Sequence, residues 1–157
     1  MEESIHSFKI ESISGEEIDF VGFKGKKIIV VNVASECGFT PQYEQLQDLY
    51  HAFQDRLVVI GFPCNDFGSQ EPGTNQEIQA FCTSRFGVGF PMTTKVSIKR
   101  NPHPIYEWLT KKSYNGISDA EVRWNFHKFL IDENGHWVAH YPSSVNPIDE
   151  VITNWVS

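Results

Sequence analysis

The chain has 157 residues, of which 40% are hydrophobic, enough for one compact domain over residues 1–157. Its 13 Lys and Arg residues are outnumbered by 20 Asp and Glu residues, and the net charge of -7 argues against a nucleic-acid partner. The start of the chain, Met1 to Ser7, is acidic and polar, and no apolar stretch is long enough to span a membrane. We therefore expect a cytoplasmic protein with no membrane partner.

The first predicted elements are a hairpin and two buried strands. Residues 8–11 and 16–19 alternate in polarity around a turn that contains Gly15, which predicts a β-hairpin. Residues 27–33 and 57–62 are continuously apolar and rich in β-branched side chains. This pattern is typical of neighbouring parallel strands that are covered by helices on both faces.

Helices are predicted after each of these strands. Thr40 and Pro41 fit the N-cap and first position of one helix, and a capping-box pattern from Thr74 to Glu77 opens another that ends near Arg85. Strand, helix and strand make a right-handed βαβ unit, so we expect an α/β fold. The remaining predicted elements are a strand at 92–96, a helix at 105–111, a strand at 126–132, a turn at 133–135, a strand at 137–141 and a final helix from Asn146–Pro147 to about Val156.

Two loops follow the carboxyl ends of the two buried strands, at residues 33–38 and 62–73. Parallel neighbours bring such ends to one edge of the sheet, where sites form in open α/β sheets. Cys37 in the first loop precedes a helix, whose free N–H groups favour a thiolate. Cysteine is also among the most often buried residue types, so a reactive thiol and a structural residue both remain open at this point.

The cysteine pattern argues against a metal site. Cys37, Cys64 and Cys82 are widely separated, and the six histidines lack ligand spacing with them, so we expect neither metal nor cofactor. No Cys-x-x-Cys pair is present, which argues against an ordinary dithiol oxidoreductase.

Three motifs in the chain resemble those of the glutathione peroxidases: NVASECGFT at 32–40, GFPCN with FGSQEPG at 61–73, and WNFHKFL at 124–130. The resemblance implies a thioredoxin-like fold, with a central mixed β-sheet flanked by helices. It also implies reduction of hydrogen peroxide and organic hydroperoxides. The implied catalytic residues are the peroxidatic Cys37 and three hydrogen-bond donors to the reacting atoms, Gln70, Trp124 and Asn125.

The resemblance also bears on how oxidised Cys37 is recycled. Cys82 lies in a segment, residues 80–91, that is similar to the resolving-cysteine segment of thioredoxin-dependent members, whereas Cys64 occupies a position that members without a resolving cysteine also carry. We therefore expect Cys82 to resolve, with thioredoxin as reductant, and the helix around it to unwind or shift so that a disulfide can form. The alternatives are a glutathione-dependent one-cysteine enzyme and a non-enzymatic peroxide sensor or redox relay.

Two further features refine the comparison with the family. Residues 113–123 are too short for the extra segment of its tetrameric members, so we expect a monomer. Glu36 stands where lysine is common and Asp66 where glutamine is common. A carboxylate near the sulfur would disfavour the Cys37 thiolate, unless solvent screens its charge.

Overall fold

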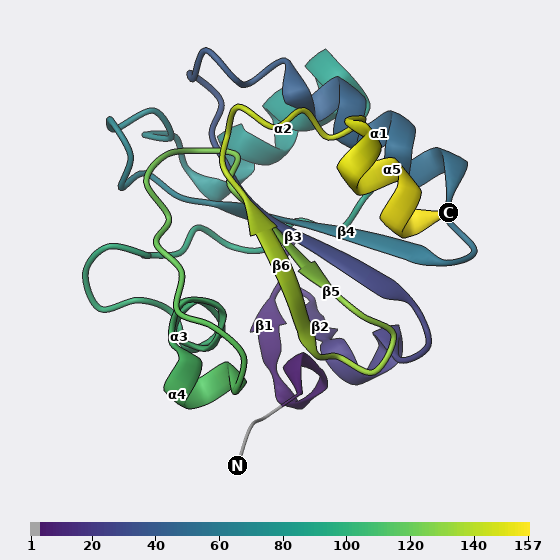
Figure 1. Ribbon diagram of the computed structural model, residues 1–157. Helices are drawn as coiled ribbons and strands as arrows, with labels where there is room; N and C mark the ends of the chain where they lie inside the picture. Colours follow the sequence, from purple (N-terminus) through teal and green to yellow (C-terminus); the bar gives the residue numbers. More distant parts are fainter. Residues whose placement is uncertain (1–3) are drawn as a thin grey trace.

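A four-stranded mixed sheet lies at the centre of the computed structural model, which describes residues 4–157 (Figure 1). The strand order is β4-β3-β5-β6. β3 (Lys27–Val33) runs parallel to β4 (Leu57–Pro63) and antiparallel to β5 (Lys128–Ile131), which pairs antiparallel with β6 (Trp137–Tyr141). The predicted mixed sheet is therefore confirmed, while Met1 to Glu3 lie outside the described residues.

The two faces of the sheet carry different elements (Figure 1). One face is covered by α1 (Gln42–Ala52), α2 (Asn75–Phe86) and α5 (Glu150–Val156), and the other by α3 (Pro104–Thr110), α4 (Lys112–Asn115) and the predicted hairpin of β1 (Lys9–Glu11) and β2 (Glu17–Asp19). Two short 3-10 helices, η1 (Ile5–Ser7) and η2 (Phe20–Phe23), flank the hairpin.

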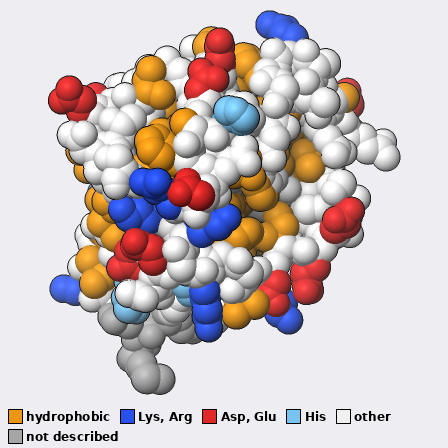
Figure 2. Space-filling view, turned by 90° about the vertical axis from the view of Figure 1, so that its right-hand side faces the viewer, with side chains coloured by type: hydrophobic (Ala, Val, Ile, Leu, Met, Phe, Trp, Pro, Cys, Tyr) orange, Lys and Arg blue, Asp and Glu red, His pale blue; other side chains and the backbone are white. Residues whose placement is uncertain are grey.

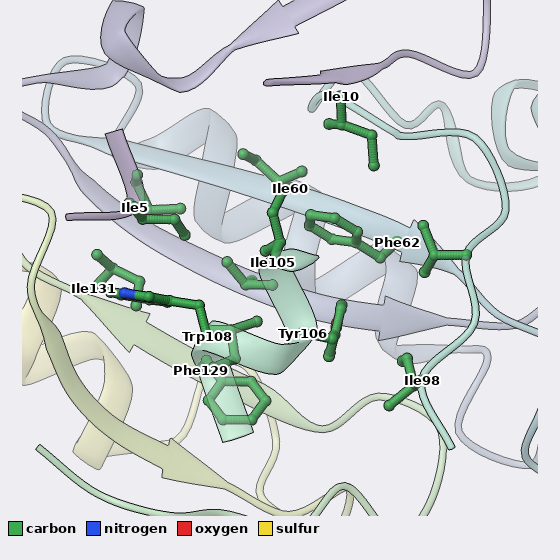
Figure 3. Close-up of a cluster of buried hydrophobic side chains, with 14 of the residues drawn as sticks. Ile5, Ile10, Ile60, Phe62, Ile98, Ile105, Tyr106, Trp108, Phe129 and Ile131 are labelled. Atoms are coloured by element: carbon green, nitrogen blue, oxygen red, sulfur yellow. The ribbon is translucent and has the colours of Figure 1, made fainter. Parts of the chain in front are cut away.

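The alternation of side chains along β3 divides the interior into two hydrophobic clusters. Ile28 and Val30 belong to the cluster beneath the hairpin and α3, and Ile29 and Val31 to the cluster beneath α1, α2 and α5. Both clusters are buried, so β3 is covered on both sides, as its continuous apolar sequence predicts. Figure 3 shows the first cluster, in which these labelled side chains converge between the sheet and α3: Ile60, Phe62, Ile105, Tyr106, Trp108, Phe129 and Ile131.

The predicted strand at 92–96 is wrong. The segment forms only two isolated bridges, Met92 with Gly61 of β4 and Thr93 with Ser12 of the hairpin turn. Its backbone bonds alternate between these two neighbours, and Pro91 before it has no N–H to extend a ladder. The segment therefore joins the hairpin to the sheet edge without forming a strand.

Several element ends also differ from the prediction, and the starts of three elements differ for a clear physical reason. β5 begins at Lys128 and not at Phe126, because Phe126 has a φ of 63°, outside the extended region. α1 begins at Gln42 without a side-chain cap, since the Thr40 hydroxyl bonds elsewhere. α5 begins at Glu150 after a cap by Asp149, while the Asn146 side chain accepts the N–H of Ile148 in the preceding turn.

The surface carries charges of both signs. On the face in Figure 2, basic and acidic side chains are interspersed, with hydrophobic side chains exposed between them. Within residues 4–157, no helix combines the length and the apolar character that crossing a membrane requires.

The capping box that begins α2 generates a stability prediction. The Glu77 N–H donates to Thr74 Oγ1 at 3.2 Å, and the Thr74 N–H donates to Glu77 Oε1 at 3.0 Å. We expect Thr74→Ala to lower the free energy of unfolding by about 1 kcal/mol, because a helix-terminal N–H loses its acceptor. Urea denaturation measures this loss, and Thr74→Ser, which keeps the hydroxyl, is the matched control. Equal losses in both variants would contradict the capping role.

Candidate active site

Cys37 lies in the loop between β3 and α1, and its side chain is almost buried. The sulfur accepts the N–H of Phe39 at 3.3 Å, and the Cys37 N–H donates to Thr40 Oγ1 at 2.9 Å. The Thr40 hydroxyl in turn donates to Ala34 O at 2.8 Å and so closes the loop. Thr40, the predicted N-cap residue, therefore fixes the cysteine loop and does not cap α1. The sulfur has a backbone N–H donor, a group that favours negative charge.

The loop after β4 is bonded directly to the cysteine loop. The Glu36 N–H donates to Gln70 O at 3.0 Å, and the Ser35 N–H donates to Glu71 Oε1 at 3.0 Å. The Glu71 N–H donates to Asn65 Oδ1 at 2.9 Å, which fixes the second loop from within. The two loops thus meet at one edge of the sheet, as their positions after parallel strands predict.

Gln70 and Asn125 are in contact although 55 residues separate them in the chain. Asn125 is fully buried, and its Nδ2 donates to Gln70 Oε1 and to Phe67 O, each at 3.1 Å. With its oxygen accepting this bond, Gln70 presents its Nε2 group as a donor to other partners. Asn125 thus orients the Gln70 amide, a relation that the motifs alone do not reveal.

Trp124 is positioned by a glycine. A Cβ built on Gly68 would lie 2.5 Å from the Trp124 ring and 3.4 Å from the Gln70 side chain, so only glycine allows this approach. Gly68 also has a φ of 73°, which side chains disfavour. The half-buried indole therefore packs against the loop that carries Gln70.

Cys82 and Cys64 are buried, and no disulfide joins the three cysteines. Burial raises the pKa of Cys82 to about 11, an effect that the nearby Tyr43 hydroxyl partly offsets, and burial raises the pKa of Cys64 to about 12. Both thiols are protonated at neutral pH. Cys82 lies within the intact helix α2 and borders the same hydrophobic cluster as Cys37.

The two departures from the family pattern have different consequences. Glu36 is exposed, so solvent screens its charge. Asp66 accepts the N–H groups of Ile98 and Lys99, at 2.7 and 3.0 Å, and thereby anchors the segment before α3. Asp66 therefore has a structural role here.

Some residues of the site were not identified from the sequence. Glu71 is fully buried, its Oε2 has no partner among the described residues, and burial raises the pKa of this carboxyl. Asn32 donates from Nδ2 to Trp124 O at 3.1 Å and accepts the His127 N–H at 3.1 Å. A polar residue in an otherwise apolar strand was the available signal for Asn32. For Glu71 the signal was its place in the motif FGSQEPG, directly after Gln70.

Within the described part of the chain, no group of three or more His, Cys, Asp or Glu side chains could hold a metal ion.

Comparison with known proteins places this site in a family. A family model described as "Glutathione peroxidase" matches residues 5–110. The chain is 42% identical to the glutathione peroxidase homolog BsaA of Bacillus subtilis, covering 92% of this chain and 91% of the relative. It is 39% identical to glutathione peroxidase-like peroxiredoxin 2 of Saccharomyces cerevisiae, over 100% and 99% of the two chains, and 44% identical to a hydroperoxy fatty acid reductase of Synechocystis sp., over 94% and 91%.

Solved structures agree with this placement. The crystal structure of Trgpx in apo form is 36% identical, with a TM-score of 0.76 over 98% of this chain and 93% of that chain. A secreted Mycobacterium tuberculosis disulfide oxidoreductase, 13% identical with a TM-score of 0.63 over 94% and 92% of the chains, shares the thioredoxin-like fold. With its fold, its three motifs and these relatives, the chain belongs to the glutathione peroxidase family and is a peroxide-reducing oxidoreductase.

Proposed function

We propose that the protein is a two-cysteine thiol peroxidase in which Cys37 attacks the peroxide and Cys82 resolves the product. The observation that carries the proposal is the Cys37 sulfur, which accepts the Phe39 N–H at 3.3 Å in a loop bonded to the loop of Gln70. Backbone donors stabilise a thiolate, the form of cysteine that reacts. Cys64 also lies in a loop and accepts a backbone N–H, that of Asp66 at 3.5 Å, but it is fully buried and burial raises its pKa to about 12. Cys82 lies within the intact helix α2.

In the first step, the Cys37 thiolate forms an S–O bond with one peroxide oxygen while the O–O bond breaks. The sulfur loses two electrons and becomes a sulfenic acid, and the other oxygen leaves as hydroxide or alkoxide and takes up a proton. The Nε2 group of Gln70 and the indole N–H of Trp124 donate to the departing oxygen in our proposal. Asn125 acts by holding Gln70, through the 3.1 Å bond between the two amides.

In the second step, Cys82 gives up its proton, its sulfur bonds to the Cys37 sulfur, and the S–O bond breaks with release of water. Because burial raises the pKa of Cys82 to about 11, the thiol is unreactive while α2 is intact. We therefore propose that α2 unwinds or shifts around Cys82 before the disulfide forms.

The disulfide is then reduced by exchange with an external dithiol, for which we propose thioredoxin, with glutathione as the competing donor. The names of two relatives support parts of this cycle: one is a peroxiredoxin, and the other is a hydroperoxy fatty acid reductase, which favours organic hydroperoxides as substrates. We expect the cycle to operate in the cytoplasm.

Cysteine substitutions test the two assigned roles. We expect Cys37→Ser to abolish peroxide consumption. Cys82→Ala should keep the first oxidation of Cys37, measured by stopped-flow tryptophan fluorescence, but lose turnover coupled to thioredoxin and thioredoxin reductase. Cys64→Ala is the matched control, because it also removes a buried thiol. Loss of turnover in Cys64→Ala together with full turnover in Cys82→Ala would assign the resolving role to Cys64. Turnover with glutathione and not with thioredoxin would make glutathione the electron donor.

The contact of Gly68 with Trp124 tests the proposed donor role. We expect Gly68→Ala to slow Cys37 oxidation by about tenfold or more, because the added methyl group displaces the indole. Gly25→Ala is the control: Gly25 also has a positive φ, of 88°, but a Cβ there meets no atom within 4 Å. Both variants strain the backbone at a positive φ, and only Gly68→Ala also displaces a side chain. Equal rates of Cys37 oxidation in the two variants would remove Trp124 from the mechanism.

We also propose that the enzyme acts as a monomer. The segment between α4 and Trp124 is folded on itself, with Asn115 Nδ2 donating to Trp108 O at 2.8 Å and to Ser118 O at 2.9 Å. Size-exclusion chromatography with light scattering should give the mass of one chain. A dimer or tetramer mass at micromolar concentration would contradict this proposal.

A further inference from the structure

Lys128 belongs to the third motif but has no role in the mechanism so far. It is fully buried at the start of β5, and its Nζ donates to three oxygens: Gln42 Oε1 at 2.6 Å, Ser143 O at 3.2 Å and Val145 O at 2.6 Å. Gln42 begins α1, and the two carbonyls belong to the segment after β6. A single ammonium group therefore joins the helix after the cysteine loop to residues 143–145.

The three contacts favour the charged form of Lys128. An ammonium has three N–H donors for the three oxygens, whereas a neutral amine has two donors and a lone pair that would face the third oxygen. Burial acts in the opposite direction and lowers the pKa of Lys128 to about 7. Among residues 4–157 no carboxylate forms an ion pair with it.

The residues that pack against the Lys128 ammonium carry no charge at neutral pH that would change its protonation. Gln42 of α1 is uncharged, and so is Val31, the residue of β3 that pairs with Lys128. Tyr141 is its partner on β6, and the adjacent His127 is neutral because burial lowers its pKa to about 4. His140 of β6 lies 2.9 Å from the His127 ring nitrogen, and burial lowers its pKa below the usual 6.5. Among these groups, Lys128 is the one with a pKa of about 7.

The residues that Lys128 holds lead directly to the donor set. Gln42 Nε2 donates to Ser143 O at 2.8 Å, so the same carbonyl is fixed from two sides. The Ser143 hydroxyl donates to Asn125 O. Asn125 then orients Gln70 through its side-chain amide.

We propose that Lys128, as an ammonium, is a positioning residue for peroxide reduction: it holds segment 143–145 so that Ser143 fixes Asn125, and Asn125 in turn orients Gln70. The inference rests on the proposed roles of Asn125 and Gln70. When Lys128 loses its proton, one of its three contacts becomes repulsive and the segment loosens. The rate of Cys37 oxidation, divided by the rate of Cys37 alkylation at the same pH, should then fall as pH rises through about 7 and Lys128 deprotonates.

The test is the pH profile of Cys37 oxidation by hydrogen peroxide, followed by stopped-flow fluorescence in the full chain. We expect Lys128→Met to lower the rate constant of Cys37 oxidation by about tenfold or more and to remove the fall in this ratio. Alkylation of Cys37 by iodoacetamide should keep its pH dependence, because Lys128 acts on the donors and not on the thiol. Lys27→Met is the matched control. Lys27 is another lysine whose Nζ donates to a backbone carbonyl, that of Trp155, but it lies at the start of β3, at the opposite end of the strand from the site.

Ser143→Ala keeps Lys128 but removes the bond to Asn125, and it decides the question if Lys128→Met does not fold. Ser143→Ala should also slow Cys37 oxidation and lack the fall in the ratio of oxidation to alkylation. Wild-type rates and pH profiles in folded Lys128→Met or in Ser143→Ala would overturn the inference, even if thermal stability falls. An equal loss of rate in Lys27→Met would also overturn it. A wild-type protein that hydrogen peroxide does not oxidise at Cys37 would instead overturn the proposed function.

Discussion

The arrangement of the site depends on one buried amide in the central strand. Asn32 has no exposed surface, and both polar atoms of its side chain bond to the segment that carries Trp124 and Asn125. Its backbone carbonyl also accepts the Phe126 N–H at 2.6 Å. Leaving such a buried amide unpaired would cost about 1–3 kcal/mol, so the segment is held against the end of β3. The positive φ of Phe126 is tolerated because these bonds determine the local path of the chain.

This anchoring explains how residues from three distant parts of the chain act together. β3 and β4 bring the loops of Cys37 and Gln70 to one sheet edge, and Asn32 adds the segment of Trp124 and Asn125. Hydrogen bonds between the loops then fix the relative positions of the groups. Pre-positioned donors are effective because they need no reorganisation when charge develops on the leaving oxygen.

The same residue type has different chemistry in three environments. Cys64 and Cys82 are surrounded by apolar side chains, and burial raises both pKa values far above neutrality. Cys37 is also nearly buried, yet its sulfur lies in a loop and accepts a backbone N–H. The Cys64 sulfur accepts a backbone N–H as well, that of Asp66 at 3.5 Å, so the donor alone does not separate these two thiols. Cys64 is fully buried, whereas Cys37 keeps some exposed surface, as a reactive cysteine needs.

Much of the fold could be predicted from local patterns. The apolar runs of β3 and β4, the hairpin and the capping box of α2 all appear where the sequence predicts them, because each depends on neighbours in the chain. The predicted strand at 92–96 and the predicted start at Phe126 were wrong, because pairing partners and backbone bonds from elsewhere determine those segments. The roles of Thr40, Glu71 and Ser143 were equally inaccessible, since their bonds form only in the folded chain.

The sequence by itself therefore determined the α/β architecture, the family and the five candidate residues Cys37, Gln70, Cys82, Trp124 and Asn125, because apolar periodicity and the three motifs are local properties of the chain. Only the tertiary structure decided how the site is held together. Asn125 donates to Gln70, the indole of Trp124 packs against Gly68, and Lys128 donates to the Ser143 carbonyl. The physical reason is that a buried polar group must find partners, and in this fold its partners come from segments that are remote in the chain.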